Sequence, residues 1–586
     1  MKSPILDDLL NKRSFVVASL LLVGLLRFVN LGFGEIQEWD EALYAVRAKS
    51  VATFGDWLDQ SNHSVGGLYS ASHPPLFVWL TAVGYKLLGI TNFTTRLWSA
   101  IFGCGLIFVA YLLGKHLASK TVGFVAAVLL GTNPLFTFYS RQGQLDLAYL
   151  FFLLTSLYFF LRYLDTIRWW WLFLAGVSFG LSLASKSVAG VLAVPIMFSL
   201  FLIRTSSNNQ GRKRPWVAPI AYVFIGMAIV FPWYVYMELR HHYDLQGGFF
   251  LPHVVGSLRS VARGLGTNVK ELGYLYFLNQ LLVRFPLSVL GFSYVLVLVV
   301  HLLKRKHQVN FTRQDLFAAL WFVIVFSVYS VLQTKVVSYT LPMLIPLSLL
   351  TARTLEKLQS NEFDRKTTTF LLLAVGISVV WSFFDDIRLA LKGFVQSIAG
   401  FKLPSAIPLS MVEFLILLAA VLVVLVLVWR KEAVRAALLK YLVPAVLLIS
   451  LASLFFQVTF VKDDDYVDGA RELATLVNQA PHREILYLHT PHYTGGMNPQ
   501  LAYHFDGVNC GWKKDILFLE MSRDRVDSLR DWMASTPERK RVFIIIEKNS
   551  ADRPVKTAGL SSVEEVASSR YKRLLETKRY ILYGGT

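Results

Sequence analysis

Two adjacent acids, Asp40 and Glu41 in the stretch EWDEALYA, are the residues of this sequence best placed to do chemistry. They follow directly on an apolar run of membrane-spanning length that ends near Phe33. Charged carboxylates at a bilayer surface are costly to keep, so the pair predicts proton abstraction or cation binding at a membrane face. The plainer alternative is that both acids stabilise the start of a helix predicted to run on to Phe54, where the helix dipole favours negative charge.

The composition predicts that these acids belong to a polytopic membrane protein. Of the 586 residues, 54% are hydrophobic and only 17% are charged, whereas a soluble domain has about 25% charged residues. The formal net charge of +19 does not indicate nucleic-acid binding, because the Lys and Arg residues form short clusters between apolar runs. Such clusters are typical of cytoplasmic loops and of contacts with anionic membrane lipids. Membrane lipids are therefore expected partners, and nucleic acid is not.

Apolar runs of about 20 residues, the length that crosses a bilayer, predict roughly thirteen transmembrane helices. An odd number puts the two ends of the chain on opposite sides, and basic clusters on alternate loops put the N-terminus in the cytoplasm. The expected location is a bacterial plasma or inner membrane. The predicted spans start near Ser14, Leu97, Val122, Leu147, Trp169, Val188, Trp216, Asn279, Leu316, Tyr339, Thr367, Ser410 and Leu438.

Two loops and one domain are expected outside the membrane. Residues 34–95 form a large external loop, in which the short apolar run from His73 to Ile90 is predicted as an amphipathic helix lying in the membrane surface. Residues 238–278 form a second external loop. From about Val461 the hydropathy falls, and the segments EILYLH and RVFIIIE indicate short buried strands.

The predicted fold class is therefore an α-helical polytopic membrane protein with a C-terminal soluble α/β domain. The transmembrane module is expected to comprise residues 1–460 and its external loops. Residues 461–586 are expected to form the soluble domain, which the topology places outside the cytoplasm.

Six segments, taken in order, resemble one protein family. They read EWDEALYAVRAKSVATFGDWL, YSASHPPLFVWL, TTRLWSAIFG, RQGQLDLAY, LASKS and TKVVSYTLPMLIPLSLL, and they extend over roughly residues 15–355. Together they resemble the ArnT and protein O-mannosyltransferase superfamily of membrane glycosyltransferases, which have the GT-C fold. The resemblance implies transfer of a sugar from a polyprenyl-phosphate carrier, with inversion, to a lipid or envelope-glycan acceptor on the outer face of the membrane.

The resemblance also implies roles for three acidic residues. Asp40 matches the acid in the first loop of the family and is the expected base for the acceptor hydroxyl, and Glu41 is expected to orient the acceptor or to tune the pKa of Asp40. Asp146 matches a second functional acid, beside which Arg141 would face the carrier phosphate or keep Asp146 ionised. The alternative for Asp146 is an ion pair with Arg141 at the membrane boundary, with no part in catalysis.

Cations on the outer side of the membrane are the expected ligands of the carrier phosphate. Lys186 and Lys335 stand at outer ends of predicted spans, against the inward bias of positive charge, although snorkelling to ordinary lipid headgroups explains them equally well. Compared with lipid A aminoarabinose transferases, His73 replaces a lysine and Leu43 replaces an arginine, which leaves the details of carrier and acceptor binding open. The expected phosphate-binding or substrate-binding residues are Arg47, His73, Arg141, Lys186, Arg284, Lys335 and Tyr339.

Alternatives remain for the cofactor and for the function. His241, His242 and His253 with Glu238 and Asp244 offer ligands for a divalent cation, but their spacing matches no zinc motif. The alternative acceptor within the same fold is a Ser or Thr of an exported protein. A secondary transporter or flippase of lipid-linked sugars is the alternative from another class, and it would carry charges near mid-membrane in two related halves. The acids of this sequence gather at one membrane face instead.

Overall fold

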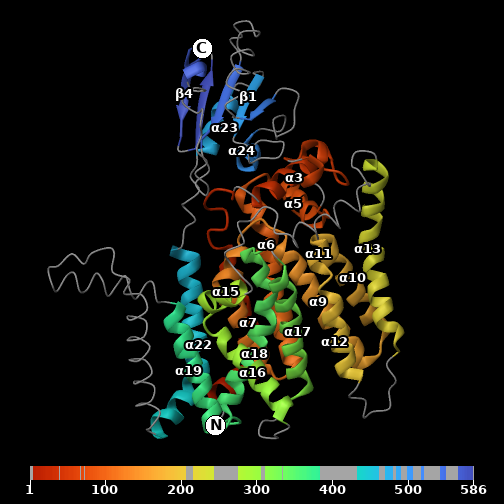
Figure 1. Ribbon diagram of the computed structural model, residues 1–586, viewed down its shortest axis with the longest axis vertical. Coiled ribbons are helices and arrows are strands. Elements are labelled where there is room, and N and C mark those ends of the chain that lie inside the picture. Colours follow the sequence, from red (N-terminus) through yellow and green to blue (C-terminus); the bar gives the residue numbers. More distant parts are fainter. Residues whose placement is uncertain are drawn as a thin grey trace, which may run out of the picture.

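Long helices packed side by side make up most of the structure, a computed structural model, and a small sheet lies beyond one end of them (Figure 1). The N-terminus lies at the opposite end of the helical bundle from the sheet. The structure describes the chain apart from residues 1–3, 38–39, 66, 71–72, 206–214, 243–274, 305–310, 333, 383–431, 461–468, 480–483, 490–497, 506–515, 521–541, 549–564, 570, 578 and 585–586.

Six described helical segments are long and apolar enough to cross a membrane. Helices of this length and composition are the form in which a chain satisfies its backbone hydrogen bonds inside a bilayer, so the chain is an integral membrane protein. The six are α6 (Asn92–Leu117), α9 (Asp146–Thr166), α11 with α12 (Ser187–Thr205), α13 (Val217–His241), α17 (Arg313–Val331) and residues Lys440–Thr459 of α22 (Glu432–Phe460).

Shorter helices complete the bundle. Every predicted span start falls on or beside a described helix except Ser410, which lies outside the described residues; the number of spans stays a prediction. The run from Asn279 is divided after Arg284, because Pro286 disfavours helical backbone at Phe285. These helices are α1 (Pro4–Asn11), α2 (Arg13–Leu25), α7 (Lys120–Thr132), α8 (Pro134–Tyr139), α10 (Trp169–Ser185), α15 (Tyr276–Arg284), α16 (Ser288–Lys304), α18 (Leu341–Gln359) and α19 (Arg365–Ser382).

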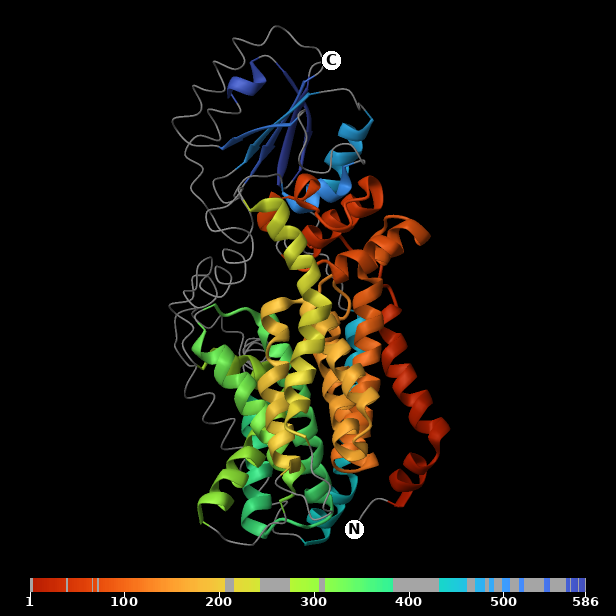
Figure 2. The same cartoon turned by 90° about the vertical axis from the view of Figure 1, so that its right-hand side faces the viewer.

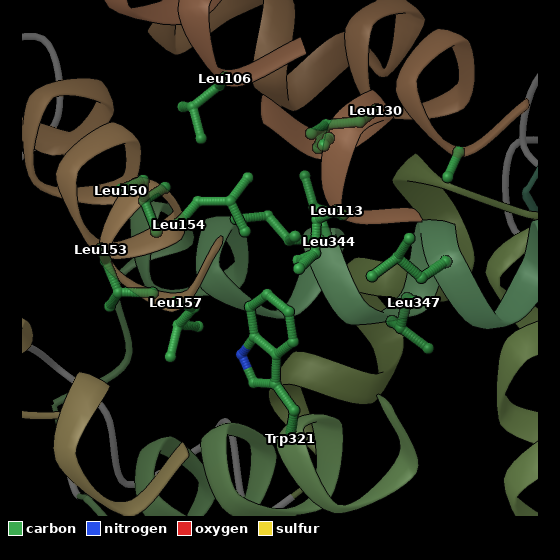
Figure 3. Close-up of a cluster of buried hydrophobic side chains, with 14 of the residues drawn as sticks. Leu106, Leu113, Leu130, Leu150, Leu153, Leu154, Leu157, Trp321, Leu344 and Leu347 are labelled. Atoms are coloured by element: carbon green, nitrogen blue, oxygen red, sulfur yellow. The ribbon is translucent and has the colours of Figure 1, made fainter. Parts of the chain in front are cut away.

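Interlocking leucines around one tryptophan form the centre of the bundle (Figure 3). Trp321 of α17 is buried in the same cluster as Leu113 of α6, Leu154 of α9 and Leu344 of α18. Packing of this density fixes the helices relative to one another. The ends of these helices nearer the sheet are therefore held in place, and these ends carry the polar residues described below.

Two helices, α3 (Asp40–Phe54) and α5 (Leu76–Leu88), lie between the bundle and the sheet (Figures 1 and 2). We call residues 40–88 the shelf. The predicted helix from Asp40 to Phe54 is confirmed. With 13 residues, α5 is about 20 Å long and too short to cross a bilayer, and it packs on both α3 and α6. The placement of the run after His73 in the membrane surface stays a prediction.

A mixed sheet of five strands forms the far end of the molecule, and we call the described residues from Gly469 to Gly584 the cap. Its strand order is β2-β1-β3-β5-β4, with β1 parallel to β2 and β3, and β5 antiparallel to β3 and β4. The predicted strands EILYLH and RVFIIIE are confirmed as β1 and β3. The elements of the cap are α23 (Ala470–Asn478), β1 (Glu484–His489), α24 (Pro499–His504), β2 (Ile516–Glu520), β3 (Val542–Glu547), β4 (Lys572–Glu576) and β5 (Tyr580–Gly584).

The cap and the shelf share one hydrophobic interior. Buried side chains of α3 and α5, such as Val46 and Val78, belong to the same cluster as Leu501 of α24 and Ile545 of β3. Helix α24 packs directly on α3. The cap is therefore bound to the shelf by apolar packing, and the shelf begins with Asp40.

Candidate active site

Glu41 forms the most completely bonded polar cluster near the start of α3. Its side chain is fully buried and pairs with Arg96 of α6, with 2.7 Å between Nε and Oε1. The same carboxylate accepts hydrogen bonds from the backbone N–H groups of Gly143 at 2.7 Å and Gln37 at 2.8 Å. Arg96 also donates to the carbonyl oxygens of Phe33 and Glu35. Glu41 thus joins the first turn of the shelf to α6 and to the turn before α9.

Asp40, one residue earlier, has different surroundings. It is the first residue of α3, and part of its surface is exposed to solvent. Many protein atoms nevertheless surround its carboxyl group. This enclosure raises the pKa of the Asp40 carboxyl above its ordinary value, the charge of Lys186 opposes the rise, and the charge of Asp146 adds to it. Asp40 is therefore an accessible carboxylate with a strengthened affinity for a proton, as a general base requires.

Asp146 and Lys186 form an ion pair beside Asp40. The Lys186 Nζ lies 2.8 Å from Oδ1 of Asp146, which is the first residue of α9 and is buried. Lys186 stands between the end of α10 at Ser185 and the start of α11 at Ser187. The rings of Tyr149 and Tyr339 lie 5.7 and 5.8 Å from its ammonium group, within cation–π range. The partner of Asp146 is thus Lys186, where the alternative interpretation expected Arg141.

Arg47 is a fully buried cation one helical turn beyond Tyr44. Its Nη2 donates to Oε1 of Gln60 at 2.9 Å and to the carbonyl oxygen of His73 at 2.8 Å. Its Nε and Nη1 have no hydrogen-bond partner among the described residues. Burial lowers the pKa of Arg47 to about 10, and the Tyr44 hydroxyl weakly opposes this. A buried cation with two unused donors is an incomplete arrangement that an anion would complete.

Three predicted phosphate ligands have other partners. Arg141 donates to the carbonyl oxygens of Arg27 at 2.9 Å and Val29 at 2.6 Å. The ammonium group of Lys335 bonds the carbonyl oxygens of Tyr329 at 3.1 Å and Ser330 at 2.7 Å, at the end of α17. Arg284 is exposed, and its Nε donates to Gln280. Their expected phosphate contacts stay predictions.

The remaining predicted residues lie nearer the acids. The His73 ring is 6.3 Å from the ring of Tyr44, and its carbonyl oxygen accepts from Arg47. The Tyr339 ring lies 4.9 Å from Tyr329 and close to Lys186. The structure thus places Asp40, Asp146, Lys186, Arg47, His73 and Tyr339 around one region where the shelf meets the bundle.

Sequence reasoning missed Arg96. It lies in TTRLWSAIFG, at the start of the long helix α6, and it neutralises Glu41. The signal was present, because an arginine at the outer end of a predicted span violates the inward bias of positive charge, as Lys186 does. The aromatic residues around Lys186 were also missed, apart from Tyr339, since helix packing and not spacing brings them together.

The proposed divalent-cation ligands do not gather into a site in the described part of the chain. His241 contacts Asp59 at 2.9 Å and His242 contacts Glu238 at 3.0 Å, whereas Asp244 and His253 lie outside the described residues. No group of three or more His, Cys, Asp or Glu side chains that could hold a metal ion is found in the ranges described.

Known proteins resemble this chain in sequence. A family profile described as dolichyl-phosphate-mannose-protein mannosyltransferase matches residues 72–236, a range that contains Asp146 and Lys186. An uncharacterised protein of Aquifex aeolicus is 24% identical over 62% of this chain and 69% of its own length. An undecaprenyl phosphate-alpha-4-amino-4-deoxy-L-arabinose arabinosyl transferase of Pseudomonas savastanoi is 26% identical over 58% of this chain and 60% of its own.

Two further comparisons concern protein mannosylation and the fold. A polyprenol-phosphate-mannose–protein mannosyltransferase of Mycobacterium tuberculosis is 27% identical over 36% of this chain and 45% of its own. The crystal structure of ArnT from Cupriavidus metallidurans bound to undecaprenyl phosphate superposes with a TM-score of 0.61, at 15% identity and over 98% of both chains. The described part of the chain, cap included, therefore shares that fold.

Proposed function

We propose that this chain, a membrane protein of GT-C fold that belongs to the ArnT and protein O-mannosyltransferase superfamily, transfers a sugar from a polyprenyl-phosphate carrier to an acceptor hydroxyl. The observation that carries the proposal is the accessible carboxylate of Asp40 beside the buried Asp146–Lys186 pair, where the bundle meets the shelf. A base and a cation at this place suit a donor whose tail lies in the membrane and whose sugar lies outside it.

In the proposed reaction Asp40 is the general base. It takes the proton of the acceptor hydroxyl while that oxygen attacks the anomeric carbon, which forms the new glycosidic bond. The bond from the anomeric carbon to the phosphate oxygen breaks on the opposite side, and its electron pair leaves with the polyprenyl phosphate. The configuration inverts, the proton stays on Asp40, and its raised pKa favours this transfer.

Cations are proposed to stabilise the departing phosphate. Lys186 forms an ion pair with Asp146, and this pair holds its ammonium group near two tyrosine rings. Arg47 has two unused donors and suits the phosphate or another anionic group of the substrates once the chain around Gln60 and His73 opens. We assign Glu41 a positioning role, because all its bonds are made within the protein.

We further propose that the cap and the shelf lie outside the cytoplasm and the N-terminus inside it, in the inner membrane of a bacterium. In this topology residues 1–460 are the transmembrane module and residues 461–586 the external domain. The alternation of basic clusters along the sequence supports this orientation. The polyprenyl-phosphate donor and a lipid or envelope-glycan acceptor then meet on the outer face.

Protein O-mannosylation is the second candidate. The family profile that matches residues 72–236 and the mycobacterial relative are both described as mannosyltransferases that act on protein, and these two observations favour a Ser or Thr acceptor. A flippase is less well supported, since the acids lie at one end of the bundle and not at mid-membrane.

The test is a transfer assay with purified protein, labelled polyprenyl-phosphate sugars and envelope extract. Label recovered in lipid or glycan supports the leading proposal, whereas label in precipitated protein supports the second candidate. Donor that crosses a vesicle membrane but is never consumed would establish the flippase instead.

A further inference from the structure

The end of α13 nearer the cap contacts the shelf through one carboxylate. Asp59, in the loop of residues 55–64 that follows α3, is buried and pairs with two cations of α13. Its Oδ2 lies 3.0 Å from Nε of Arg240 and 2.9 Å from Nε2 of His241. One residue earlier, the carbonyl oxygen of Leu58 accepts a hydrogen bond of 2.9 Å from the indole N–H of Trp233. Separating such a buried pair is costly, so the loop is held against α13.

The next residue of the same loop, Gln60, fixes Arg47. Its Oε1 accepts the hydrogen bond from Nη2 of Arg47 at 2.9 Å. Its Nε2 donates to the carbonyl oxygens of Asp56 and Trp57, each at 2.9 Å. Because Gln60 is buried and both atoms of its amide have partners, its side chain moves only with the loop. The position of Arg47 therefore depends on how the loop is held.

The same part of α13 also contacts the chain beside Lys186. The Tyr234 hydroxyl forms a hydrogen bond with the side chain of Ser187, which directly follows Lys186. Helix α13 packs along α10, which ends at Ser185. One helix thus touches both the loop that fixes Arg47 and the segment that carries Lys186, the two cations proposed to meet the phosphate.

We propose that Asp59 is a positioning residue for this transfer reaction. By joining the loop of residues 55–64 to α13, it sets Arg47 at the distance from Lys186 that the carrier phosphate requires. This inference rests on the proposed function, with Arg47 as a ligand of that phosphate. Asp59 acts through Arg47 and not on the substrate. A merely structural ion pair would instead lower stability without a selective loss of phosphate binding.

Carrier binding tests this role on the full chain in detergent, measured by native mass spectrometry. Undecaprenyl phosphate is the probe, and undecaprenol, which lacks the phosphate, is its neutral control. We expect Asp59→Asn to weaken undecaprenyl phosphate binding about tenfold and to leave undecaprenol binding unchanged. Arg240→Gln removes one of the two cations and should weaken binding of the phosphate about threefold.

Two further variants separate positioning from stability. Asp165 also lies between a histidine and an arginine, His116 and Arg204, but at the other end of α9 from Asp146. Asp165→Asn should lower the thermal unfolding temperature and leave binding of both probes unchanged. In an Arg47→Met background Asp59→Asn should cause no further loss, because effects that pass through one residue do not add.

Three results would overturn the positioning role. Equal losses of undecaprenyl phosphate and undecaprenol binding would mean that Asp59 only stabilises the fold. A further loss when Asp59→Asn is added to Arg47→Met would mean that Asp59 does not act through Arg47. Unchanged or tighter phosphate binding in Asp59→Asn would contradict the role directly. If Asp59→Asn does not fold, Arg240→Gln is judged by the same three criteria.

The transfer assay distinguishes this inference from the proposed function. Asp59→Asn should raise the KM for the donor about tenfold and leave kcat and the KM for the acceptor unchanged, because it removes uniform binding of the phosphate. Transfer with an unchanged donor KM would reject the positioning role and leave the proposed function standing. Binding of undecaprenyl phosphate that depends on Asp59, in a protein that consumes no donor, would do the reverse.

Discussion

Asp40 and Glu41 are neighbours in the first turn of α3, yet their carboxylates meet opposite surroundings. Successive residues of an α-helix point about 100° apart, so one of two adjacent acids can face the interior while the other faces an opening. Glu41 is fully buried and bonded to Arg96, Gly143 and Gln37, whereas Asp40 remains accessible beside an ion pair. The difference indicates that an acid whose bonds are all made within the protein stabilises the fold, whereas an acid that remains accessible can react.

Asp40→Asn should produce the largest effect. The amide cannot take the proton of the acceptor, so we expect kcat to fall about a thousandfold, equivalent to about 4 kcal/mol of barrier. The thermal unfolding temperature should stay the same, because Asp40 makes no ion pair in the described structure. Transfer at more than a tenth of the normal rate would remove Asp40 from the role of base.

Glu41→Gln should show the opposite pattern. The change leaves the Arg96 guanidinium buried without its counter-charge, which costs about 3 kcal/mol of stability. Thermal unfolding in detergent, compared with the exposed control Arg365→Gln, measures this loss. An unaltered unfolding temperature together with lost transfer would mean that Glu41 acts in the chemistry, and the contrast with Asp40 would fail.

Tyr503→Phe tests whether the cap stabilises the polar cluster around Glu41. The Tyr503 hydroxyl lies 3.3 Å from Oγ1 of Thr95, the neighbour of Arg96, and Thr95 also bonds Tyr85 at 2.6 Å. We expect a stability loss of about 1 kcal/mol with kcat unchanged, and no loss for the exposed control Tyr441→Phe. A drop in kcat at unchanged stability would show that the cap acts on the reacting groups.

The smallest expected change is a displacement of the pH profile. Transfer needs ionised Asp40, so kcat/KM should fall as the pH drops through the raised pKa of Asp40. Lys186→Met removes a charge that lowers this pKa, so the acid limb should move to higher pH. Asp146→Asn removes a charge that raises it, so the limb should move to lower pH. If both variants moved the acid limb in the same direction, this limb would not report the titration of Asp40.

The sequence predicted the elements better than the contacts. The helix from Asp40, the two strands β1 and β3, and the short helix after His73 follow from apolar spacing, which is a local property. Asp146 and Lys186 were each identified, but their pairing was not, because it depends on how α9 and α10 pack. Arg141 seemed the natural partner of Asp146 only because it is near in sequence.

Lys335 shows a second limit of the sequence. A lysine at the outer end of a span suggests a phosphate ligand, but its ammonium group bonds carbonyl oxygens that α17 leaves without partners at its end. Both roles predict the same position along the chain. Only the contact of the ammonium group with these carbonyl oxygens, which no recognisable sequence motif encodes, distinguishes them.

The hydrophobic interior shared by the cap and the shelf limits which segments can be exchanged between related proteins. Val46 and Val78 of the shelf complete the packing of Leu501 and Ile545, although more than 400 positions separate them in the printed sequence. A chimera that takes only the last 126 residues from a relative would join two mismatched surfaces. Exchange of the cap between relatives would therefore require residues 40–88 to be exchanged with it.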